Sequence, residues 1–448
     1  MIVLKFGGTS VQSSEWMDKT IDISLKFILK APVVVSSAMS TVTDKLVAIS
    51  QSAAGGDISK ASTLVQEIRL LHEKTAQEFL SGEYLAKALS ALDEYVKEMT
   101  SLVKGLSLLK ECTPRSSDAL LSFGELLSTT LLASRAMERG IKTQLLDARH
   151  FMITTDEFTS ASPIFEITDK EIRNQVKPEP GLLIITQGFI GRTQTGATTT
   201  LGRGGSDYSA TIIGAALDAL EVQIWTDVDG IMTTDPRIVP GARTIERISY
   251  EEAAELAYFG AKVVHPSTIQ PAVKKQIPVL VKNTRNPEGV YTAITSQVEG
   301  KGLRAIAGKK NISLINVTSS RMLNAYGFLN RIFSIFEKYK TAVDLIATSE
   351  VSVSMTIDNI QSIGLIVNEL EKIGTVTVEH GKSIICLVGQ SFWKDPSFIA
   401  QVFTAMNTIP VRMISLGSSD INLSLVVPGE MLDRALQHLH DYFLKPSN

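Results

Sequence analysis

Short apolar runs alternate with amphipathic stretches over the first two thirds of the chain. The runs occupy residues 2–6, 33–35, 182–185, 222–225 and 279–281, and Gly, Ser, Thr, Asp or Asn follow each of them. β-Branched runs that end at such residues are typical of buried strands, whereas the stretches between them repeat apolar positions at helical spacing. Strands that alternate with helices predict an α/β fold, with a mainly parallel central sheet and helices on both faces.

Two stretches break this alternation. Between residues 53 and 114 the strand signal disappears and apolar positions follow a helical period, which predicts a helical insertion or lid. Between residues 285 and 302, the Gly-containing segments 286–289 and 300–302 interrupt a weakly patterned sequence. Gly and Pro at this density favour a linker.

The C-terminal third repeats one order of elements: strand, helix, strand, strand, helix. The first set is expected at 313–317, 327–339, 343–346, 351–357 and 361–373. The second set is expected at 384–388, 397–406, 411–414, 421–427 and 431–443. This repetition predicts two copies of one small α+β unit.

Length and charge narrow the functional classes. A chain of 448 residues exceeds one comfortable hydrophobic core, so two or three domains are expected. The net charge of −3 and the lack of a like-charge block give no support to nucleic acid or membrane as a partner. Cys112 and Cys386 form no Cys-x-x-Cys motif, and the N-terminal apolar run is too short for a signal peptide. The cytoplasm is therefore the expected location.

The first predicted strand ends at a lysine and a pair of glycines. Lys5 supplies a positive charge, and Gly7 and Gly8 let backbone N–H groups approach an anion at the start of the next helix. The segment is not a Walker A loop, because Gly-x-x-x-x-Gly-Lys is absent. Phosphate binding and a tight turn beside a solvated lysine both stay open on this segment alone.

A second glycine loop spans residues 198–207 and leads into another helical pattern. Arg203 lies among three glycines, Asp207 follows, and Ser206 is expected to cap the helix. An arginine that forks onto a carboxylate, next to an aspartate, suits the two charged groups of an amino acid. A glycine-rich turn in which Asp207 only favours the helix dipole would not account for Arg203.

Further polar residues follow the predicted strands. Ser37 and Thr43 belong to a hydroxyl-rich stretch that can orient a phosphate or carboxylate, although helix capping explains part of it. A polar stripe on an otherwise apolar helix consists of Asp118, Ser122, Glu125 and Thr129. Such a stripe is usually a solvated face, but Gly124 in mid-helix implies that something approaches closely. The extended turn at 226–237 can wrap a base and ribose, or be a plain turn.

Several catalytic signatures are missing from the sequence. There is no Ser-His-Asp motif, no His and Cys cluster for a metal, and no dinucleotide fingerprint. Phosphoryl transfer to a carboxylate needs none of them, because a carboxylate with a pKa of about 4 is already ionised at neutral pH. Such an enzyme has to hold two anions in line and neutralise them with lysine, arginine, helix N-termini and Mg²⁺.

Five motifs, in order, resemble the lysine-sensitive monofunctional aspartokinases: residues 5–10, 122–128, 200–207, 225–237 and 259–266. The resemblance extends from residue 1 nearly to the C-terminus. It implies an amino-acid-kinase domain at 1–296 and two ACT domains. The first ACT domain, at 311–380, would be inserted into the second, at 302–310 and 381–448. The implied reaction is phosphorylation of the side-chain carboxylate of aspartate by Mg-ATP, the first step towards lysine, methionine and threonine.

The resemblance also implies roles for individual residues. Lys5 would bridge the γ-phosphate and the attacking carboxylate, and Arg203 and Asp207 would complete the catalytic set. The implied aspartate pocket consists of Ser37, Thr43, Glu125, Arg203 and Asp207. The implied ATP contacts are Lys5, Gly7, Gly8, Thr226, Asp227, Met232, Arg237, Lys262 and Val263. Met232 stands where many relatives carry tyrosine, and no side chain is expected to bind a metal, since Mg²⁺ arrives with ATP.

A lysine effector site is implied in the first ACT domain. Its residues would be Met322, Ala325, Gly327, Phe328, Leu329, Asp344, Thr348, Ser349 and Glu350. The N–H groups near Gly327 can take an α-carboxylate, while Asp344 and Glu350 offer oxygens to ammonium groups. A turn with a solvated acidic pair is the alternative, and threonine is the second candidate effector.

Assembly and two other functions complete the expectations. ACT units usually bury a sheet edge or face against a partner, so at least a homodimer through residues after Gly302 is expected. A kinase for glutamate or an N-acylated amino acid is one other function, but it would not be expected to carry the tandem ACT units. An amino-acid sensor with a dead kinase domain is another, and the presence of Lys5, Glu125 and Arg203 speaks against it.

Overall fold

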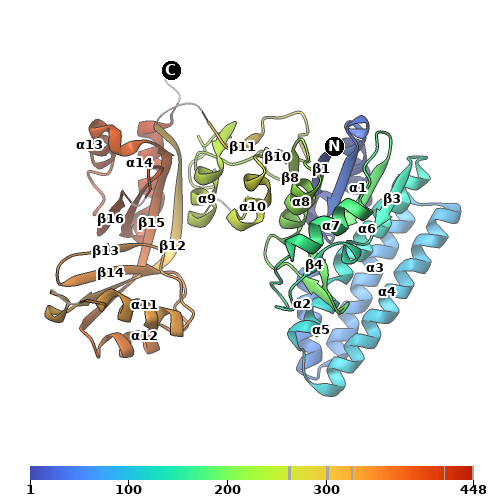
Figure 1. Ribbon diagram of the computed structural model, residues 1–448, viewed down its shortest axis with the longest axis horizontal. Helices are drawn as coiled ribbons and strands as arrows, with labels where there is room; N and C mark the ends of the chain where they lie inside the picture. The colour runs from blue at the N-terminus through green and yellow to red at the C-terminus, as the bar shows by residue number, and fades with distance from the viewer. Residues whose placement is uncertain (261–263, 299–301, 324–325, 418, 446–448) are drawn as a thin grey trace. The chain divides into compact units, whose positions relative to one another are not determined.

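The computed structural model describes residues 1–260, 264–298, 302–323, 326–417 and 419–445, without the side chain of Trp393. Residue contacts divide the chain into two compact units. Figure 1 colours the chain by residue number from the N-terminus to the C-terminus. The first unit comprises Met1–Ile231, Glu246–Tyr250 and Val263–Gln297. The second comprises Met232–Ile245, Glu251–Lys262 and Val298–Asn448. Two segments of the predicted kinase region thus have most of their contacts in the second unit.

An eight-stranded sheet forms the centre of the first unit, in the order β3-β5-β2-β1-β8-β10-β11-β9. Its strands are β1 Ile2–Phe6, β2 Pro32–Ser36, β3 Thr143–Leu146, β5 Leu183–Gln187, β8 Val222–Thr226, β9 Arg247–Ser249, β10 Val279–Asn283 and β11 Thr292–Thr295. Neighbouring strands are parallel except for the antiparallel pair β10 and β11. The five strands expected from the sequence are adjacent members of this sheet, so the predicted mainly parallel α/β fold is confirmed.

The helices of the first unit pack around this sheet. They are α1 Ser14–Leu25, α2 Val42–Ala54, α3 Ile58–Phe79, α4 Gly82–Leu109, α5 Pro114–Leu121, α6 Phe123–Glu138, α7 Phe165–Gln175, α8 Gly205–Ala216 and α10 Pro266–Lys274. Helix α9, Tyr250–Phe259, belongs to the second unit from Glu251 onward. Shorter 3₁₀ helices lie at Gly8–Val11, Ile28–Lys30, Ala148–His150, Ser320–Met322, Phe392–Lys394 and Gly429–Met431.

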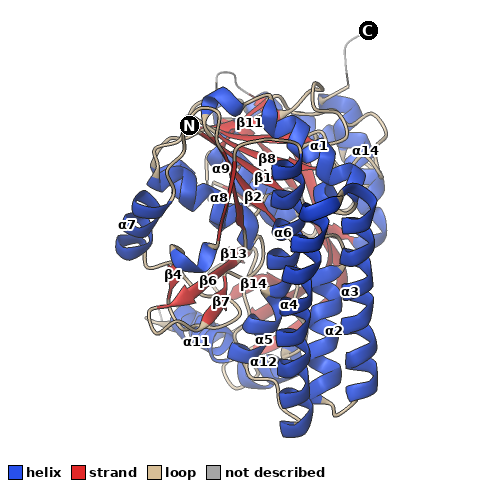
Figure 2. Cartoon of the chain, turned by 90° about the vertical axis from the view of Figure 1, so that its right-hand side faces the viewer, coloured by secondary structure: helices blue, strands red, loops and turns tan. Residues whose placement is uncertain are grey.

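The predicted helical insertion is confirmed as a layer of long helices. Helices α2, α3, α4 and α6 pack side by side, as Figure 2 shows. Each buries one stripe: in α3, Ala61, Val65 and Ile68 recur at helical spacing and are at most 2% exposed. A helix with an apolar stripe of this kind is stabilised when the stripe is buried against neighbouring helices. None of the described helices is both long and apolar enough to span a bilayer.

A small sheet and a broken helix bring further segments of the first unit together. Strands β4 Ile153–Thr154, β6 Ile190–Thr193 and β7 Thr198–Thr200 form a three-stranded sheet in that order. Strand β7 leads directly into the second glycine loop. The polar stripe assigned to one helix falls on two, because α5 ends at Leu121 and α6 starts at Phe123. The stripe is not solvated: Asp118, Ser122 and Glu125 are at most 3% exposed.

The second unit contains a six-stranded sheet in the order β13-β14-β12-β15-β17-β16. Its strands are β12 Gly302–Thr318, β13 Ile346–Thr348, β14 Ser352–Ile357, β15 Thr375–Gln390, β16 Met413–Leu416 and β17 Asn422–Pro428. Its helices, besides α9, are α11 Phe328–Lys338, α12 Ile363–Leu370, α13 Pro396–Ala405 and α14 Leu432–Phe443. The expected repetition of strand, helix, strand, strand, helix is therefore present in both halves.

Two long strands run through both repeats, and each repeat has its own core. One core groups Ile315, Phe328 and Leu370 with their neighbours, and the other groups Ile385, Leu425 and further residues up to Leu444. The pairing of β12 with β15 shifts register between Lys309 and Ile312. Gly381 takes a positive φ of 67°. Both irregularities lie at the expected boundary between the ACT domains.

One expected strand is wrong in its position. Residues 343–345 carry no strand, and β13 starts at Ile346. The Thr356 hydroxyl accepts the hydrogen bond of the Leu345 N–H group at 2.9 Å. The Asp344 N–H group donates to the Thr356 carbonyl at 2.8 Å, and the Thr356 N–H group donates to the Leu345 carbonyl at 3.0 Å, so residues 344 and 345 pair irregularly with β14.

Candidate active site

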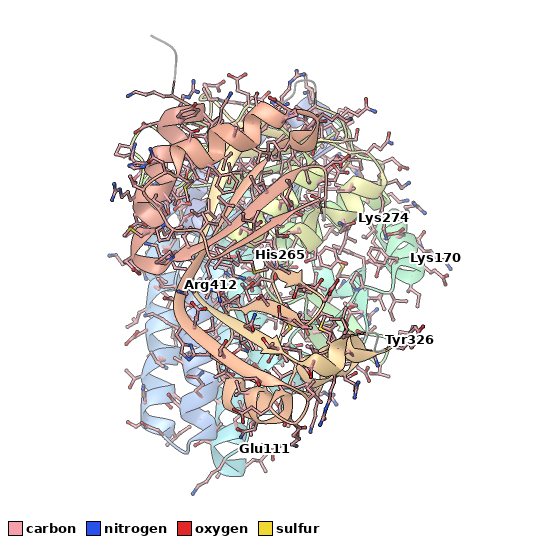
Figure 3. All side chains as sticks on the ribbon, turned by 90° about the vertical axis from the view of Figure 1, so that its left-hand side faces the viewer. Glu111, Lys170, His265, Lys274, Tyr326 and Arg412 are labelled. Carbon is pink, nitrogen blue, oxygen red and sulfur yellow. The ribbon has the colours of Figure 1, made fainter. Side chains whose placement is uncertain are left out.

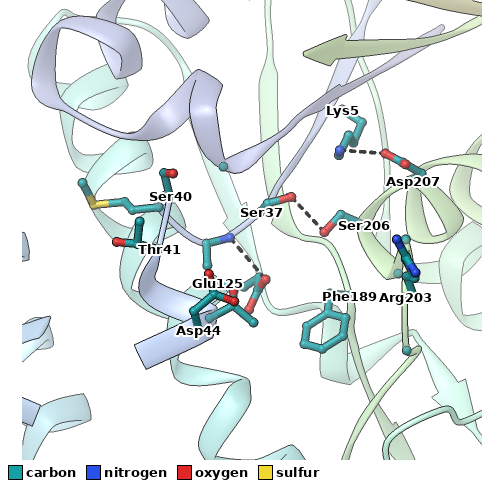
Figure 4. A pocket seen from close by; sticks show the side chains of 17 residues that line it. Lys5, Ser37, Ser40, Thr41, Asp44, Glu125, Phe189, Arg203, Ser206 and Asp207 are labelled. Carbon is teal, nitrogen blue, oxygen red and sulfur yellow. Dashed lines mark hydrogen bonds and ion pairs between the residues drawn. The ribbon is translucent and has the colours of Figure 1, made fainter. Parts of the chain in front are cut away.

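A cavity of about 410 Å³ lies beyond the carboxyl ends of β1, β2 and β5 in the first unit. Its lining includes all five residues of the expected aspartate pocket, together with Lys5 and Gly8 (Figure 4). The other lining residues are Ala38, Met39, Ser40, Thr41, Asp44, Phe189, Gly202, Gly204, Gly205 and Ser206. Open α/β sheets bind ligands at this edge, because strand ends and helix N-termini converge there.

Lys5 and Asp207 form an ion pair in this cavity, with Nζ 2.7 Å from Oδ1. Lys5 is on β1, and Asp207 lies in the first turn of α8. Their side chains are 11% and 12% exposed, so both charges are shielded from water but reachable from the cavity. The pair places a positive charge near a helix N-terminus, where an anion is stabilised.

Glu125 is the most deeply buried acid of the cavity. The Ala38 N–H group donates to its Oε1 at 3.2 Å, while Oε2 has no partner among the described residues. Burial raises the pKa of Glu125 to about 8, because the N–H donor offsets only part of the desolvation. Gly124 accounts for this placement: a Cβ there would meet the Ala38 Cβ at 2.8 Å, so α6 could not come as close.

The glycine loop holds Arg203 towards the cavity. Gly202 and Gly204 have φ values of 73° and 70°, which disfavour residues with a Cβ. Arg203 is exposed, and no described residue is a hydrogen-bond or ion-pair partner of its guanidinium. All five N–H donors are therefore available to a ligand.

The predicted helix cap at Ser206 is wrong. Helix α8 begins at Gly205, and its N-cap is Gly204 in the left-handed region. Because the chain turns at Gly204, Ser206 already lies inside the first turn. Its hydroxyl instead accepts a hydrogen bond from the Ser37 hydroxyl at 2.9 Å, which joins the loop after β2 to α8.

The expected nucleotide residues are distributed over both units. Gly7 and Gly8 follow β1, and the Gly7 N–H group donates to the Trp225 carbonyl at 3.1 Å. Thr226 is the last residue of β8 in the first unit, and Asp227 follows it. Met232 and Arg237 belong to the second unit, where Arg237 pairs with Asp235 at 2.7 Å and is 88% exposed. Lys262 and Val263 lie outside the described residues.

Sequence reasoning missed two contributors to the first unit's cavity. Phe189 lines it after β5, with a positive φ of 68° that no sequence pattern indicated. Asp118 lies behind the cavity, where it accepts hydrogen bonds from Thr159 and Thr200. The only signal for Asp118 was its place in the polar stripe with Glu125.

A second cavity, of about 520 Å³, lies in the first ACT repeat. Of the expected effector residues, it is lined by Met322, Gly327, Phe328, Leu329, Ser349 and Glu350. Leu323 and Tyr326 complete the lining, and Tyr326 projects fully into solvent (Figure 3). Ala325 lies outside the described residues, and Thr348 is on β13 without lining the cavity.

Asp344, also expected in the effector site, has internal partners instead. Its side chain is 1% exposed and does not line the second cavity. Its Oδ1 accepts hydrogen bonds from the Tyr258 hydroxyl at 2.6 Å and from Lys309 Nζ at 2.8 Å. Burial and this bond to Asp344 raise the pKa of Tyr258. The second oxygen, Oδ2, has no partner among the described residues.

The described residues contain no group of three or more His, Cys, Asp or Glu side chains placed to hold a metal ion.

Residues 1–283 match the amino acid kinase family, and residues 385–443 match an ACT domain. The parallel sheet, the two glycine loops and the Lys5–Asp207 pair are thus those of an amino-acid kinase with a regulatory region.

Relatives narrow this class. The chain is 40% identical to the chloroplastic aspartokinase 3 of Arabidopsis thaliana, over 99% of this chain and 81% of the relative. It matches the crystal structure of Escherichia coli aspartokinase III with aspartate and ADP, in the R-state. There the TM-score is 0.85 and the identity 37%, over 99% of both chains. The T-state structure of that enzyme with lysine and aspartate matches at 0.81 and 36%, again over 99% of both chains. The chain belongs to the aspartokinase family.

Proposed function

We propose that this protein transfers the γ-phosphoryl group of Mg-ATP to the side-chain carboxylate of L-aspartate, which yields ADP and 4-phospho-L-aspartate. The observation that carries this proposal is one cavity that contains Lys5, Glu125, Arg203 and Asp207. Two cationic and two acidic side chains match the charges of an amino acid with a second carboxylate. The related Escherichia coli enzyme, crystallised with aspartate and ADP, supports the same pairing of substrates.

The acceptor is oriented through its amino-acid end. Arg203, whose guanidinium has no partner among the described residues, forks onto the α-carboxylate. The α-ammonium group lies between Asp207 and Glu125, whose Oε2 has an acceptor site to offer. Ser37 and Thr43 line the remaining wall. Fixing one end of aspartate in this way directs its side-chain carboxylate towards Lys5.

The chemical step needs no general base. The acceptor carboxylate is ionised at neutral pH, so its oxygen attacks the γ-phosphorus while the bond to the bridging oxygen breaks and ADP leaves. Lys5 lies between the two anions and neutralises the charge that develops on the transferring group. Asp207 keeps the Lys5 ammonium in place at 2.7 Å before the substrates arrive. Mg²⁺ enters with the phosphates of ATP.

We place the nucleotide beyond the ends of β1 and β8. Backbone groups at Gly7 and Gly8 contact the phosphates, and Thr226 and Asp227 contact the ribose or base. Met232, Arg237, Lys262 and Val263 complete this proposed contact set. The Gly7 bond to the Trp225 carbonyl supports the idea, because it fixes the glycine turn next to the end of β8.

The test is an assay of the purified protein with Mg-ATP, in which hydroxylamine traps the acyl phosphate. Turnover with aspartate, and little with glutamate or N-acetylglutamate, is the expected result. Preference for glutamate or its N-acetyl derivative would assign the protein to a neighbouring kinase. If the protein turns over ATP with none of the three amino acids, an amino-acid sensor with a dead kinase domain becomes the better account.

We propose lysine as a feedback inhibitor that binds in the second cavity. Phe328 at the start of α11 and the oxygens of Ser349 and Glu350 line that cavity, which suits an amino acid with two ammonium groups. The Escherichia coli relative has been crystallised with lysine in a T-state, which supports a basic effector. Asp344 would join this site if its carboxylate released Lys309 and bound an ammonium group of the effector instead. Threonine is the other effector to be titrated.

Domain boundaries, assembly and compartment stay proposals. The two separate cores and the irregularities near Lys309 and Gly381 support ACT domains at 311–380 and at 302–310 with 381–448. We propose a homodimer through the ACT domains, which light scattering at micromolar concentration would test. The cytoplasm is the proposed compartment, in keeping with the free thiols of Cys112 and Cys386.

A further inference from the structure

Asp118 is a buried carboxylate in the first unit that the proposed reaction does not use. It lies on α5, and its side chain is fully buried. The Thr159 and Thr200 N–H groups each donate to Oδ2 at 2.9 Å, and the Thr200 hydroxyl donates to Oδ1 at 2.8 Å. A carboxylate is costly to bury unless such bonds compensate it. These three bonds therefore fix the two backbone segments that supply the donors.

Both segments hold the turn that carries Arg203. Thr200 is the last residue of β7, three positions before Arg203. Gly202 packs against the Thr159 and Ser160 backbone, where a Cβ would meet the Thr159 carbonyl at 3.3 Å. The Ala161 N–H group donates to the Thr200 carbonyl at 2.9 Å, which closes this side of the turn. Asp118 is thus the only charged side chain among the described residues that bonds to both edges of the Arg203 turn.

The helix that carries Asp118 also reaches the opposite wall of the cavity. Helix α5 packs on β7 and on α2. Helix α2 begins at Val42, and Thr41, Thr43 and Asp44 around its start line the cavity. Through α5 and α2, the helical layer therefore braces the hydroxyl-rich wall against the wall that holds Arg203.

We propose that Asp118 is a positioning residue that sets the Arg203 guanidinium for the α-carboxylate of the acceptor. The proposal rests on the function proposed above, in which Arg203 binds that carboxylate. A bidentate contact tolerates only about 0.5 Å of displacement, and a shift of about 1 Å can cost about 100-fold. Loss of the Asp118 anchor raises the KM for the acceptor amino acid, while the ATP site, which lies outside this turn, keeps its KM.

The test compares Asp118→Ala with Asp118→Asn. The amide of asparagine can accept both N–H groups with its oxygen and donate to the Thr200 hydroxyl, so Asp118→Asn should restore near-normal behaviour. Asp118→Ala should raise the KM for aspartate by about 10-fold or more and change the KM for ATP by less than about 2-fold. Hydrogen exchange at residues 196–207 should accelerate in Asp118→Ala and not in Asp118→Asn.

Thr168→Val is the matched control. Thr168 is fully buried on α7 and makes two hydrogen bonds to Ile153, on β4, which is the far edge of the small sheet from β7. It should lower the melting temperature as Asp118→Ala does, without the change in the KM for aspartate. If both variants raise both KM values alike, Asp118 is merely structural and the proposal is wrong.

A milder variant and the exchange measurement keep the proposal testable if Asp118→Ala does not fold or the wild type is inactive. If Asp118→Ala does not fold, Thr200→Val, which removes only the hydroxyl bond, should still raise the KM for aspartate about 3-fold. An unchanged KM there overturns the proposal. If the wild type phosphorylates no amino acid, the proposed function fails by itself. Hydrogen exchange at residues 196–207 then still decides whether Asp118 holds the turn.

Discussion

The two units each contain a shielded lysine–aspartate pair, and the pairs differ in what surrounds them. Lys5 and Asp207 are 2.7 Å apart and border the cavity of the first unit. Lys309 and Asp344 are 2.8 Å apart, and neither lines the second cavity. Lys309 also contacts Asp358 at 2.9 Å and lies over the Tyr258 ring at 4.7 Å.

This difference separates a pair available for chemistry from a pair engaged in structure. Burial lowers the pKa of Lys309, but its bonds to Asp344 and Asp358 outweigh burial, and the pKa stands above its usual value. Lys309 is therefore charged and lies between two carboxylates, whereas Lys5 pairs with one carboxylate among the described residues and lines the first cavity. The Lys5–Asp207 pair is thus available to a ligand, because the glycine loops of the first unit leave room for one. The Lys309–Asp344 pair stabilises the second unit.

Lys5→Met should have the largest effect. We expect kcat to fall about 100- to 1,000-fold, because one preorganised donor at the transferring group supplies about 3–4 kcal/mol. The melting temperature should fall less than in Lys309→Met, because Asp207 borders a cavity and is 12% exposed, whereas Asp344 is 1% exposed. Steady-state assays with Mg-ATP and aspartate measure the effect, and Lys19→Met, in an exposed pair with Glu15, is the control that should stay active. Near-normal turnover of Lys5→Met would remove Lys5 from the catalytic set.

Lys309→Met should lower stability and leave kcat nearly unchanged, in contrast to Lys5→Met. Removing one partner of a shielded pair leaves Asp344 charged and poorly compensated, so we expect a loss of about 3 kcal/mol in stability. Thermal unfolding should show a melting temperature lower by about 6–10 °C, with kcat in the absence of lysine nearly unchanged. The neighbouring Lys310→Met is the control: its pair with Asp433 is about half exposed and should contribute less than about 1 kcal/mol. Equal losses in the two variants would contradict the comparison.

Glu350→Lys tests the second cavity. If lysine binds an inactive state through Glu350, coupling of the usual size, about 1–3 kcal/mol, should disappear. We expect activity without lysine to be unchanged and inhibition by lysine to vanish in a titration. Glu337→Lys makes the same charge change on α11 without touching the cavity, and should remain inhibited. Unchanged inhibition of Glu350→Lys, or a wild type that ignores lysine, would exclude this site.

The sequence predicted the strands of the first sheet because their apolar runs and end residues are local signals. The family resemblance implied one site for Lys5, Glu125, Arg203 and Asp207, and all four line one cavity. It could not predict Asp118 as an anchor, because the Thr200 donor lies 82 positions away and no spacing links the two.

Residues that depend on distant partners were placed least well. Asp344 fits an effector motif, yet Lys309 and Tyr258, 35 and 86 positions away, bind it in the structure. Ser206 fits a helix cap, but the left-handed conformation of Gly204 starts the helix earlier. Such outcomes depend on tertiary contacts that override a local preference.

The smallest expected effect concerns the pH dependence of Glu125. Its pKa of about 8 means that the carboxyl is mostly neutral at pH 7. An ammonium group binds the charged form, so the KM for aspartate should fall as pH rises from about 6 to about 8, by up to about 10-fold per unit. Glu125→Gln should have a higher KM at pH 8 and lack this slope. A wild-type KM that is flat over this range would contradict the assignment of Glu125.

The free energy of unfolding should fall as pH rises, whereas the affinity for aspartate should increase, and Glu125 is the cause of both changes. In the unfolded chain this carboxyl ionises near the ordinary glutamate pKa of 4.5, whereas in the folded protein it holds its proton up to about pH 8. Stability that is fully present below 4.5 is therefore lost as pH rises towards 8, because the unfolded state releases its proton first. Glu125→Gln keeps a neutral group at every pH, so its melting temperature should rise relative to the wild type across this window. Opposite slopes in affinity and stability would mark Glu125 as a carboxyl that is buried at a cost in stability for the sake of the ammonium group. A slope in stability without a slope in the KM for aspartate would show that the ammonium group does not bind Glu125.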